Sequence, residues 1–140
     1  GNSVAADVLL RLAKLLGDDK YDRFAITVLR LMASQLRKYP QGFGRALSAL
    51  EFHLSVTKEI VVIGAKGNEL EREVLSMYLP NSVLVSSSQP ELESAVVPLL
   101  VDRKTIDGKP TAYICENCVC QQPVTTVDEI FKTLHKKATS

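Results

Sequence analysis

Tryptophan is absent from this 140-residue sequence, aromatic residues make up 6% of it, and cysteine occurs only three times. No apolar run approaches the roughly 20 residues that a membrane-spanning helix requires, so no membrane association is expected. The sequence also lacks a large excess of positive or negative charge, because 17 basic and 16 acidic residues leave a net charge of +1 at pH 7. Without a basic stripe to hold a phosphate backbone, nucleic acid is not an expected partner.

What is present describes a folded chain. Hydrophobic residues make up 46% and charged residues 24%, which is typical of a globular protein of one domain, or of two small units sharing a core. Three cysteines crowded into six positions are not the spaced, even set of a secreted disulfide scaffold, so we expect a reducing, cytoplasmic location. The sequence starts at Gly1 without a methionine, which suggests a piece of something longer.

Residues 1–56 show apolar residues at helical spacing in three segments. We expect a first helix over residues 2–16, a second that begins at Asp18 and is closed by Pro40, and a third over about residues 43–55. The short turn between the first two predicts an antiparallel helical hairpin. The residues expected to be buried are Tyr21, Phe24, Ala25, Val28, Met32 and Leu36 in the second helix, and Phe43, Ala46, Leu47, Leu50 and Leu54 in the third.

Residues 57–140 change to the pattern of a small α/β unit. A β-branched run at residues 60–63 predicts a strand buried on both faces, as in a parallel sheet. Asn68 caps a helix that leads to a second strand at residues 82–85, which completes a βαβ unit with a right-handed crossover.

The remaining segments are shorter. A helix is expected around residues 91–97, and a capping box at residues 126–129 starts the last helix. Asp107 and Gly108 form a turn signal, which predicts a hairpin between residues 103–106 and residues 111–115.

Together these elements predict an α+β fold. A helical segment, residues 1–56, packs with a small, mostly parallel α/β sheet unit, residues 57–140. The expected core strands are residues 60–63, 82–85 and 112–115.

The cysteines form a Cys115-x-x-Cys118-x-Cys120 cluster, which could bind metal or carry out redox chemistry. A structural zinc site needs four ligands, usually in two close pairs, and neither His53 nor His135 completes the cluster at a recognisable spacing. The sequence therefore indicates metal binding only weakly, as a third possibility in which three protein ligands leave one position open, and we assign no metal ligand.

A redox pair usually precedes a helix N-terminus that stabilises the thiolate. Here residues 119–122 and Pro123 intervene before any helix, and Glu116 disfavours a neighbouring thiolate. The favoured interpretation is that Cys115 is a small, buried hydrophobic residue at a strand end. We predict no catalytic residue and no cofactor site, and retain the cluster as redox or structural cysteines.

The loop at residues 64–67 lies between a strand and a helix, where backbone amides could hold a phosphate. It matches neither the dinucleotide-binding fingerprint nor the Walker loop, and glycines at such a turn need no ligand. His53 is interpreted as a packed or interface histidine.

Several motifs at the two ends of the chain resemble one family. They are Gly-Asn-Ser-Val-Ala-Ala at residues 1–6 with Leu-Leu-Arg-Leu after it, Asp-Gly-Lys-Pro-Thr-Ala-Tyr-Ile-Cys at residues 107–115, and Pro123-Val124. With Gly17, Tyr21 and Cys120, they resemble the C-terminal region of the spermatogenesis-associated, thioredoxin-domain-containing family, over residues 1 to about 134.

This resemblance implies an architecture. In that family an N-terminal thioredoxin-like domain precedes a helical region similar to the six-hairpin α/α toroids of glycosidases and sugar epimerases, and a small α/β unit ends the chain. Residues 2–55 would then be the last toroid helices, and residue 59 onward the terminal unit. The family pattern has Cys115 and Cys120 but usually not Cys118, which makes Cys115 and Cys120 the pair to test.

The function expected from these observations is a non-catalytic, C-terminal structural or interaction module of a larger protein of unknown activity. Its partners would be the upstream helical and thioredoxin-like domains, and apolar helix faces left uncovered could drive self-association. The alternative is part of a thiol–disulfide redox or carbohydrate-acting enzyme to which Cys115 and Cys120 contribute. Whether the chain is an enzyme stays open at this point.

Overall fold

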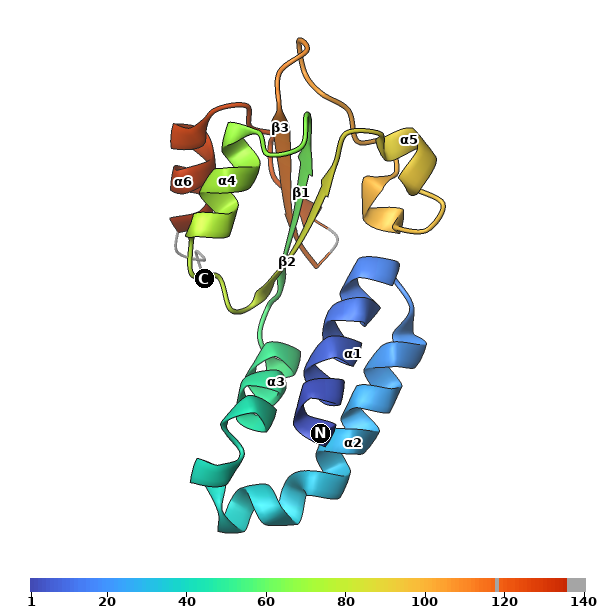
Figure 1. The fold of residues 1–140 in the computed structure, drawn as a ribbon, viewed down its shortest axis with the longest axis vertical. Coiled ribbons are helices and arrows are strands. Elements are labelled where there is room, and N and C mark those ends of the chain that lie inside the picture. Colours follow the sequence, from blue (N-terminus) through green and yellow to red (C-terminus); the bar gives the residue numbers. More distant parts are fainter. Residues whose placement is uncertain (118, 136–140) are drawn as a thin grey trace. The chain divides into compact units, whose positions relative to one another are not determined.

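The computed structural model describes residues 1–117 and 119–135, so Cys118 and residues 136–140 lie outside the described part. The chain divides into two compact units, Gly1–Thr57 and Lys58–Ser140. The first is all helical and the second is a mixed α/β unit, which confirms the predicted α+β fold class (Figure 1).

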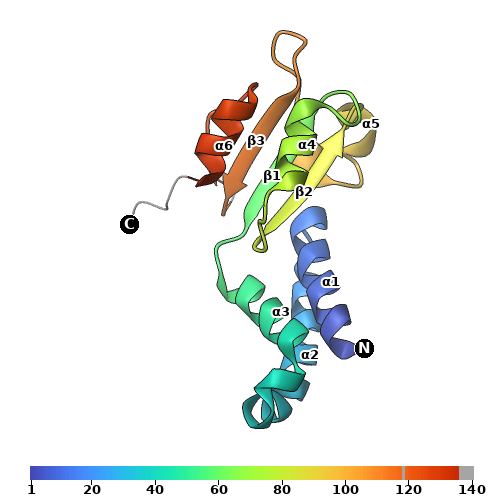
Figure 2. The same ribbon diagram turned by 60° about the vertical axis from the view of Figure 1, so that its left-hand side comes forward.

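The helical unit contains α1 (Asn2–Leu16), α2 (Asp19–Lys38) and α3 (Gly44–Leu54). Helix α1 ends at Gly17, whose φ of 62° is the left-handed conformation that glycine adopts readily. The Asp18 side chain caps α2 by accepting a hydrogen bond from the Lys20 N–H at 2.9 Å. Helices α1 and α2 lie side by side, as the predicted hairpin requires (Figures 1 and 2).

The core of this unit differs in part from the predicted one. Phe24 is 54% exposed and Leu54 is 74% exposed, whereas Leu29 and Phe52 are buried. The buried stripe of α2 runs through Ala25, Leu29 and Met32, and that of α3 through Ala46, Ala49 and Phe52, so each helix is rotated about its axis relative to the prediction. The buried residues are Ala6, Leu10, Ala25, Leu29, Met32, Ala46, Ala49 and Phe52.

The second unit is built on a four-stranded sheet in the order β2-β1-β3-β4. Strands β1 (Lys58–Ile63) and β2 (Ser82–Ser87) are parallel and are connected through α4 (Glu69–Ser76). Strand β3 (Thr111–Glu116) runs antiparallel to β1, and β4 (Val119–Cys120) antiparallel to β3. The sheet is therefore mixed, and the expectation that it is mostly parallel is wrong. Strand β3 begins beside the end of β1, with Thr111 opposite Ile63, and so must run back along it.

The predicted hairpin around Asp107 is present only as a turn. Asp107 and Gly108 have φ values of 54° and 68°, but Ile106 and Lys109 form an isolated bridge and no strand precedes them in this described stretch. Side chains of β3 replace the strand pairing, because the buried Thr111 hydroxyl accepts a hydrogen bond from the Ile106 N–H at 2.9 Å. Strand β4 was not predicted, because the sequence interpretation treated its residues as part of a loop.

Both faces of the sheet are covered. Helices α4 and α6 (Val127–His135) lie on one face, and the short helix α5 (Pro90–Glu93) with the 3₁₀ turn Pro98–Leu100 lies on the other (Figures 1 and 2). Successive side chains of β1 point to opposite faces of the sheet. Ile60 and Val62 therefore pack in the hydrophobic core on the α4 and α6 face, and Val61 and Ile63 in the core on the other face. Within the described ranges, no helix is both long and apolar enough to cross a membrane.

Candidate functional site

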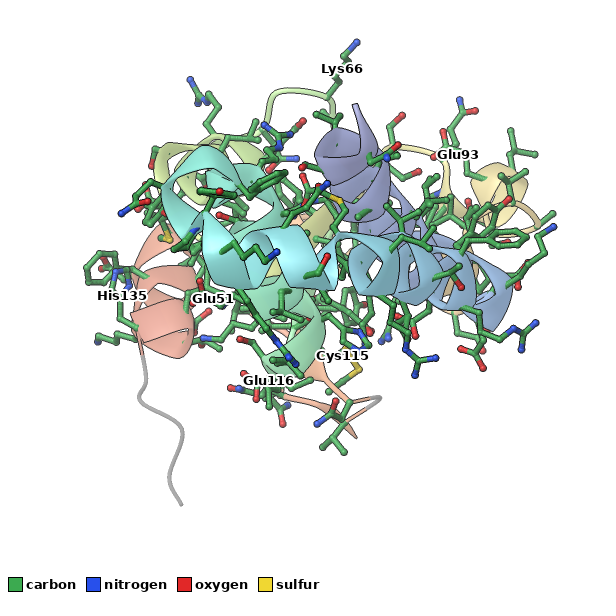
Figure 3. All side chains as sticks on the ribbon, turned by 90° about the horizontal axis from the view of Figure 1, so that it is seen from below. Glu51, Lys66, Glu93, Cys115, Glu116 and His135 are labelled. Atoms are coloured by element: carbon green, nitrogen blue, oxygen red, sulfur yellow. A yellow bond between two sulfur atoms is a disulfide. The ribbon has the colours of Figure 1, made fainter. Side chains whose placement is uncertain are left out.

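The β3–β4 hairpin brings two of the three cysteines together. Cys115 and Cys120 are paired across the ladder with Cα atoms 3.9 Å apart, and their sulfurs form a disulfide (Figure 3). Cys115 is 3% exposed, as a buried strand residue should be, but it is not a free thiol. The third member of the predicted cluster, Cys118, lies outside the described residues.

The hairpin gives the physical basis for joining Cys115 and Cys120, which the family resemblance named as the pair to test without predicting a bond between them. Glu116 pairs with Val119, and Asn117 starts the turn with a φ of 50°, a left-handed conformation that asparagine tolerates. An asparagine between two cysteines five positions apart was therefore the available signal.

Arg103 lies against the disulfide, although nothing in the sequence pattern pointed to it. Its Nη2 donates to Cys120 Sγ at 3.3 Å and to Cys115 Sγ at 3.7 Å. Its Nε donates to the Leu99 carbonyl at 3.3 Å, and its guanidinium lies 4.8 Å above the Tyr113 ring. These contacts hold a positive charge next to both sulfurs.

A cavity of about 250 Å³ adjoins Arg103 on the same side of the sheet. Asp102, with a left-handed φ of 60°, and Lys104 contribute to its wall beside Leu100. Arg103 therefore borders this cavity as well as the disulfide.

The histidines do not gather with the cysteines. His53 belongs to the helical unit, where its Nδ1 lies 3.5 Å from Asp22 Oδ1. His135, on α6, stacks on Phe131 with ring centroids 4.0 Å apart, and Figure 3 shows it well separated from Cys115. Among the residues that the structure describes, no group of three or more histidine, cysteine or acidic side chains could hold a metal ion.

Near the loop at residues 64–67, backbone N–H groups donate hydrogen bonds to side chains of the same segment. The Gly67 N–H donates to Glu71 Oε2 at 2.7 Å, and Asn68 Oδ1 accepts from the N–H groups of Leu70 and Glu71, both at 3.0 Å. A Cβ atom on Gly64 would lie 3.2 Å from Pro110. Packing and capping thus account for this loop, and the geometry does not favour a phosphate there.

The capping box of α6 perturbs one carboxylate. The Thr125 N–H donates to Glu129 Oε2 at 3.1 Å, and the Glu129 N–H donates to Thr126 Oγ1 at 3.3 Å. The hydrogen bond from Thr125 is the main reason that the pKa of Glu129 lies below its ordinary value of 4.5.

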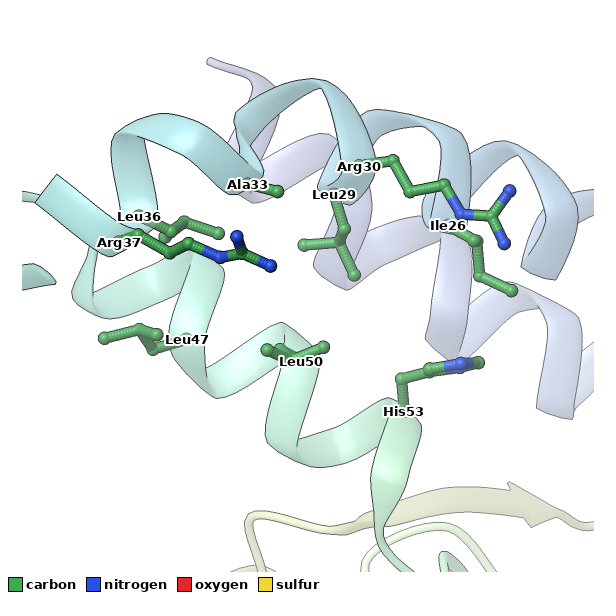
Figure 4. A pocket seen from close by; sticks show the side chains of 9 residues that line it. All are labelled: Ile26, Leu29, Arg30, Ala33, Leu36, Arg37, Leu47, Leu50 and His53. Atoms are coloured by element: carbon green, nitrogen blue, oxygen red, sulfur yellow. The ribbon is translucent and has the colours of Figure 1, made fainter.

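The helical unit carries an open apolar groove between α2 and α3, with a volume of about 490 Å³ (Figure 4). Leu29 and Leu50 face one another across it, and Arg30 and Arg37 extend from α2 beside them. Its lining consists of Ile26, Leu29, Arg30, Ala33, Leu36, Arg37, Leu47, Leu50 and His53.

Comparison with known proteins places the chain beside one group. It is 31% identical over 140 residues to spermatogenesis-associated protein 20 of Homo sapiens and 31% identical over 141 residues to that of Rattus norvegicus. It is also 27% identical over 139 residues to an uncharacterised protein of Caenorhabditis elegans. No family model matches the chain, and no solved structure matches it significantly.

These alignments cover nearly all of this chain but only a small part of each relative. Each of the two mammalian alignments covers 96% of this chain but 18% of the relative, so the chain spans less than a fifth of the length of those relatives. Their agreement supports the family resemblance inferred from the terminal motifs. Over nearly its whole length the chain is homologous to a part of spermatogenesis-associated protein 20.

Proposed function

We propose that this chain is a non-catalytic structural module that docks, through its helical unit, on an amphipathic helix of the same, longer protein. The open apolar groove between α2 and α3 is the observation that carries this proposal. Apolar side chains left facing solvent as a continuous surface typically mark a place where another element packs.

The composition of the groove suits a helix-binding site. Six of its lining residues are aliphatic, and Leu47 on its wall is 39% exposed although it faces α2. A helix that lays its apolar stripe into such a groove buries leucine side chains on both partners, which stabilises the pair by about 2 kcal/mol for each leucine buried.

Positively charged residues beside the groove indicate which residues the docking helix should carry next to its apolar stripe. Arg30 and Arg37 are exposed, lie two turns apart on α2 and border the groove along one side. A docking helix with aspartate or glutamate next to its apolar stripe would place opposite charges against these guanidinium groups. The relatives are long enough to supply such a helix, since this chain matches only 18% of spermatogenesis-associated protein 20.

On this proposal the occupant is an upstream helix of a toroid-like region, beyond which lies the thioredoxin-like domain that the family resemblance implies, and the protein is cytoplasmic. The alternative function, a thiol–disulfide redox role, has one specific observation behind it, the Cys115–Cys120 disulfide. Nothing comparable in the described residues favours a carbohydrate-acting site.

The test compares Leu47→Asp with Leu31→Asp, each in residues 1–140 alone and in the full-length protein. Leu31 is a matched control because it lies on α2, is 78% exposed and does not line the groove. We expect Leu47→Asp to lower the free energy of unfolding by about 2 kcal/mol more in the full-length protein than in residues 1–140 alone. Leu31→Asp should have similar small effects in both.

Two results would overturn the proposal. Equal destabilisation by Leu47→Asp in both proteins would mean that nothing covers the groove. A dimer of residues 1–140 in sedimentation velocity, dissociated by Leu47→Asp but not by Leu31→Asp, would make a second copy the occupant.

A further inference from the structure

We propose that Cys115 and Cys120 form a thiol–disulfide exchange site in which an incoming thiolate attacks Cys120 and Cys115 leaves as a thiolate beside Arg103. This inference concerns the α/β unit alone and is independent of the docking groove. It rests on the different accessibility of the two sulfurs and on the position of one guanidinium group.

The two cysteines differ in exposure. Strand β4 is the edge of the sheet, with β3 as its neighbour in the strand order, and Cys120 on β4 is exposed. Cys115 lies on β3 between β1 and β4 and is 3% exposed. Because exchange requires a nucleophile to reach one sulfur, attack at Cys120 is open and attack at Cys115 is blocked.

Arg103 stabilises the group that leaves. Its Nη2 lies 3.7 Å from Cys115 Sγ and 3.3 Å from Cys120 Sγ, within reach of either thiolate. A hydrogen bond to the Leu99 carbonyl and the contact with the Tyr113 ring already orient the guanidinium. The side chain of Arg103 therefore needs little movement when negative charge develops on sulfur. A cationic neighbour of this kind is typical of reactive cysteines.

Other charged groups border the pair. The register places Glu59 of β1 directly opposite Cys115, and Asp102 and Lys104 flank Arg103 in the chain. Arg103 differs from them in donating directly to the sulfurs. Glu116 follows Cys115 on β3, so its side chain points to the other face of the sheet.

The reaction balances with a dithiol as reductant. One thiolate of the dithiol attacks Cys120 Sγ, the Cys115–Cys120 bond breaks, and its electron pair passes to Cys115 Sγ. The second thiolate of the dithiol then attacks the reagent sulfur of the mixed disulfide, which releases Cys120 as a thiolate and the reagent as a disulfide. Two electrons pass to the protein, and the reverse sequence restores its disulfide.

The first experiment measures the rate of disulfide reduction by dithiothreitol at neutral pH, in a Cys118→Ser background that removes the third thiol. We expect Arg103→Gln to slow reduction about tenfold, because the leaving thiolate loses a charge-assisted hydrogen bond. Arg103→Lys should recover most of that rate, since it keeps a positive charge. Arg72→Gln, which removes an exposed guanidinium from α4, is the matched control and should leave the rate unchanged.

The second experiment traps the attacked sulfur. In the same background, glutathione should form a mixed disulfide on Cys120, identified by peptide mass spectrometry, with Cys115 recovered as the free thiol. This measurement needs no Arg103 variant, so it decides the mechanism even if Arg103→Gln fails to fold.

Three results would overturn the proposal. They are a glutathione adduct on Cys115, reduction of a folded Arg103→Gln variant at the parental rate, and two free thiols in the Cys118→Ser protein after incubation with excess oxidised glutathione.

Discussion

Tyr113 and Lys104 are joined by two hydrogen bonds through a single hydroxyl group. The Tyr113 hydroxyl donates to the Lys104 carbonyl at 2.6 Å and accepts from the Lys104 N–H at 3.2 Å. One β3 side chain therefore satisfies both backbone groups of a residue in an irregular segment. Because Arg103 precedes Lys104 and lies over the same ring, this pairing also positions the guanidinium beside the disulfide.

Replacing Tyr113 by phenylalanine should lower the free energy of unfolding by about 2 kcal/mol, because two backbone groups lose their partner while the ring stays packed. Urea unfolding measures the change. Tyr78→Phe is the matched control, since Tyr78 is 90% exposed, and should change the free energy little. A Tyr113→Phe variant as stable as the parent would show that water replaces the hydroxyl without loss.

Asn68→Ala should destabilise the α/β unit by about 1 kcal/mol, because Asn68 Oδ1 accepts from two N–H groups at the start of α4. Gln89→Ala is the comparison, since Gln89 stands at the N-cap of α5 without a side-chain capping bond. Thermal unfolding followed by circular dichroism distinguishes them. Equal shifts of the two melting temperatures would contradict the role of the cap.

Gly64→Ala should destabilise the protein by about 1–3 kcal/mol, because the new methyl group would lie 3.2 Å from Pro110 and the backbone φ of 157° is rare for a side-chain-bearing residue. Gly42→Ala, where no atom lies within 4 Å of the added Cβ, is the control. Chemical unfolding of both variants gives the comparison. A tolerated Gly64→Ala would mean that the loop can move away from Pro110.

Glu129 should make the stability of the protein depend on pH in the acidic range. Its pKa is lowered in the folded state, first by the hydrogen bond from Thr125, so its contribution is complete above the ordinary value of 4.5 and is lost as pH falls through the folded-state pKa. Melting temperatures measured from neutral pH down to about pH 3 should fall less steeply for Glu129→Gln than for the parent. Glu93→Gln, at an exposed carboxylate on α5, should follow the parent, and parallel curves for all three would refute the effect.

The sequence by itself determined the local elements. Helical periodicity, Asn68 as a cap and the β-branched run of β1 are properties of neighbouring residues, so the helices α1 to α4 and the strands β1 to β3 were found close to their observed bounds. The family resemblance was likewise carried by contiguous motifs, which the relatives support.

Only the tertiary structure decided how these elements combine. The direction of β3 depends on where the connection delivers the chain, and the burial of Leu29 in place of Phe24 depends on which face of α2 packs against α1 and α3. Arg103 reaches Cys115 and Cys120 across 12 and 17 positions of the chain. Such contacts arise from packing between segments with no shared periodicity, so no local pattern in the sequence could announce them.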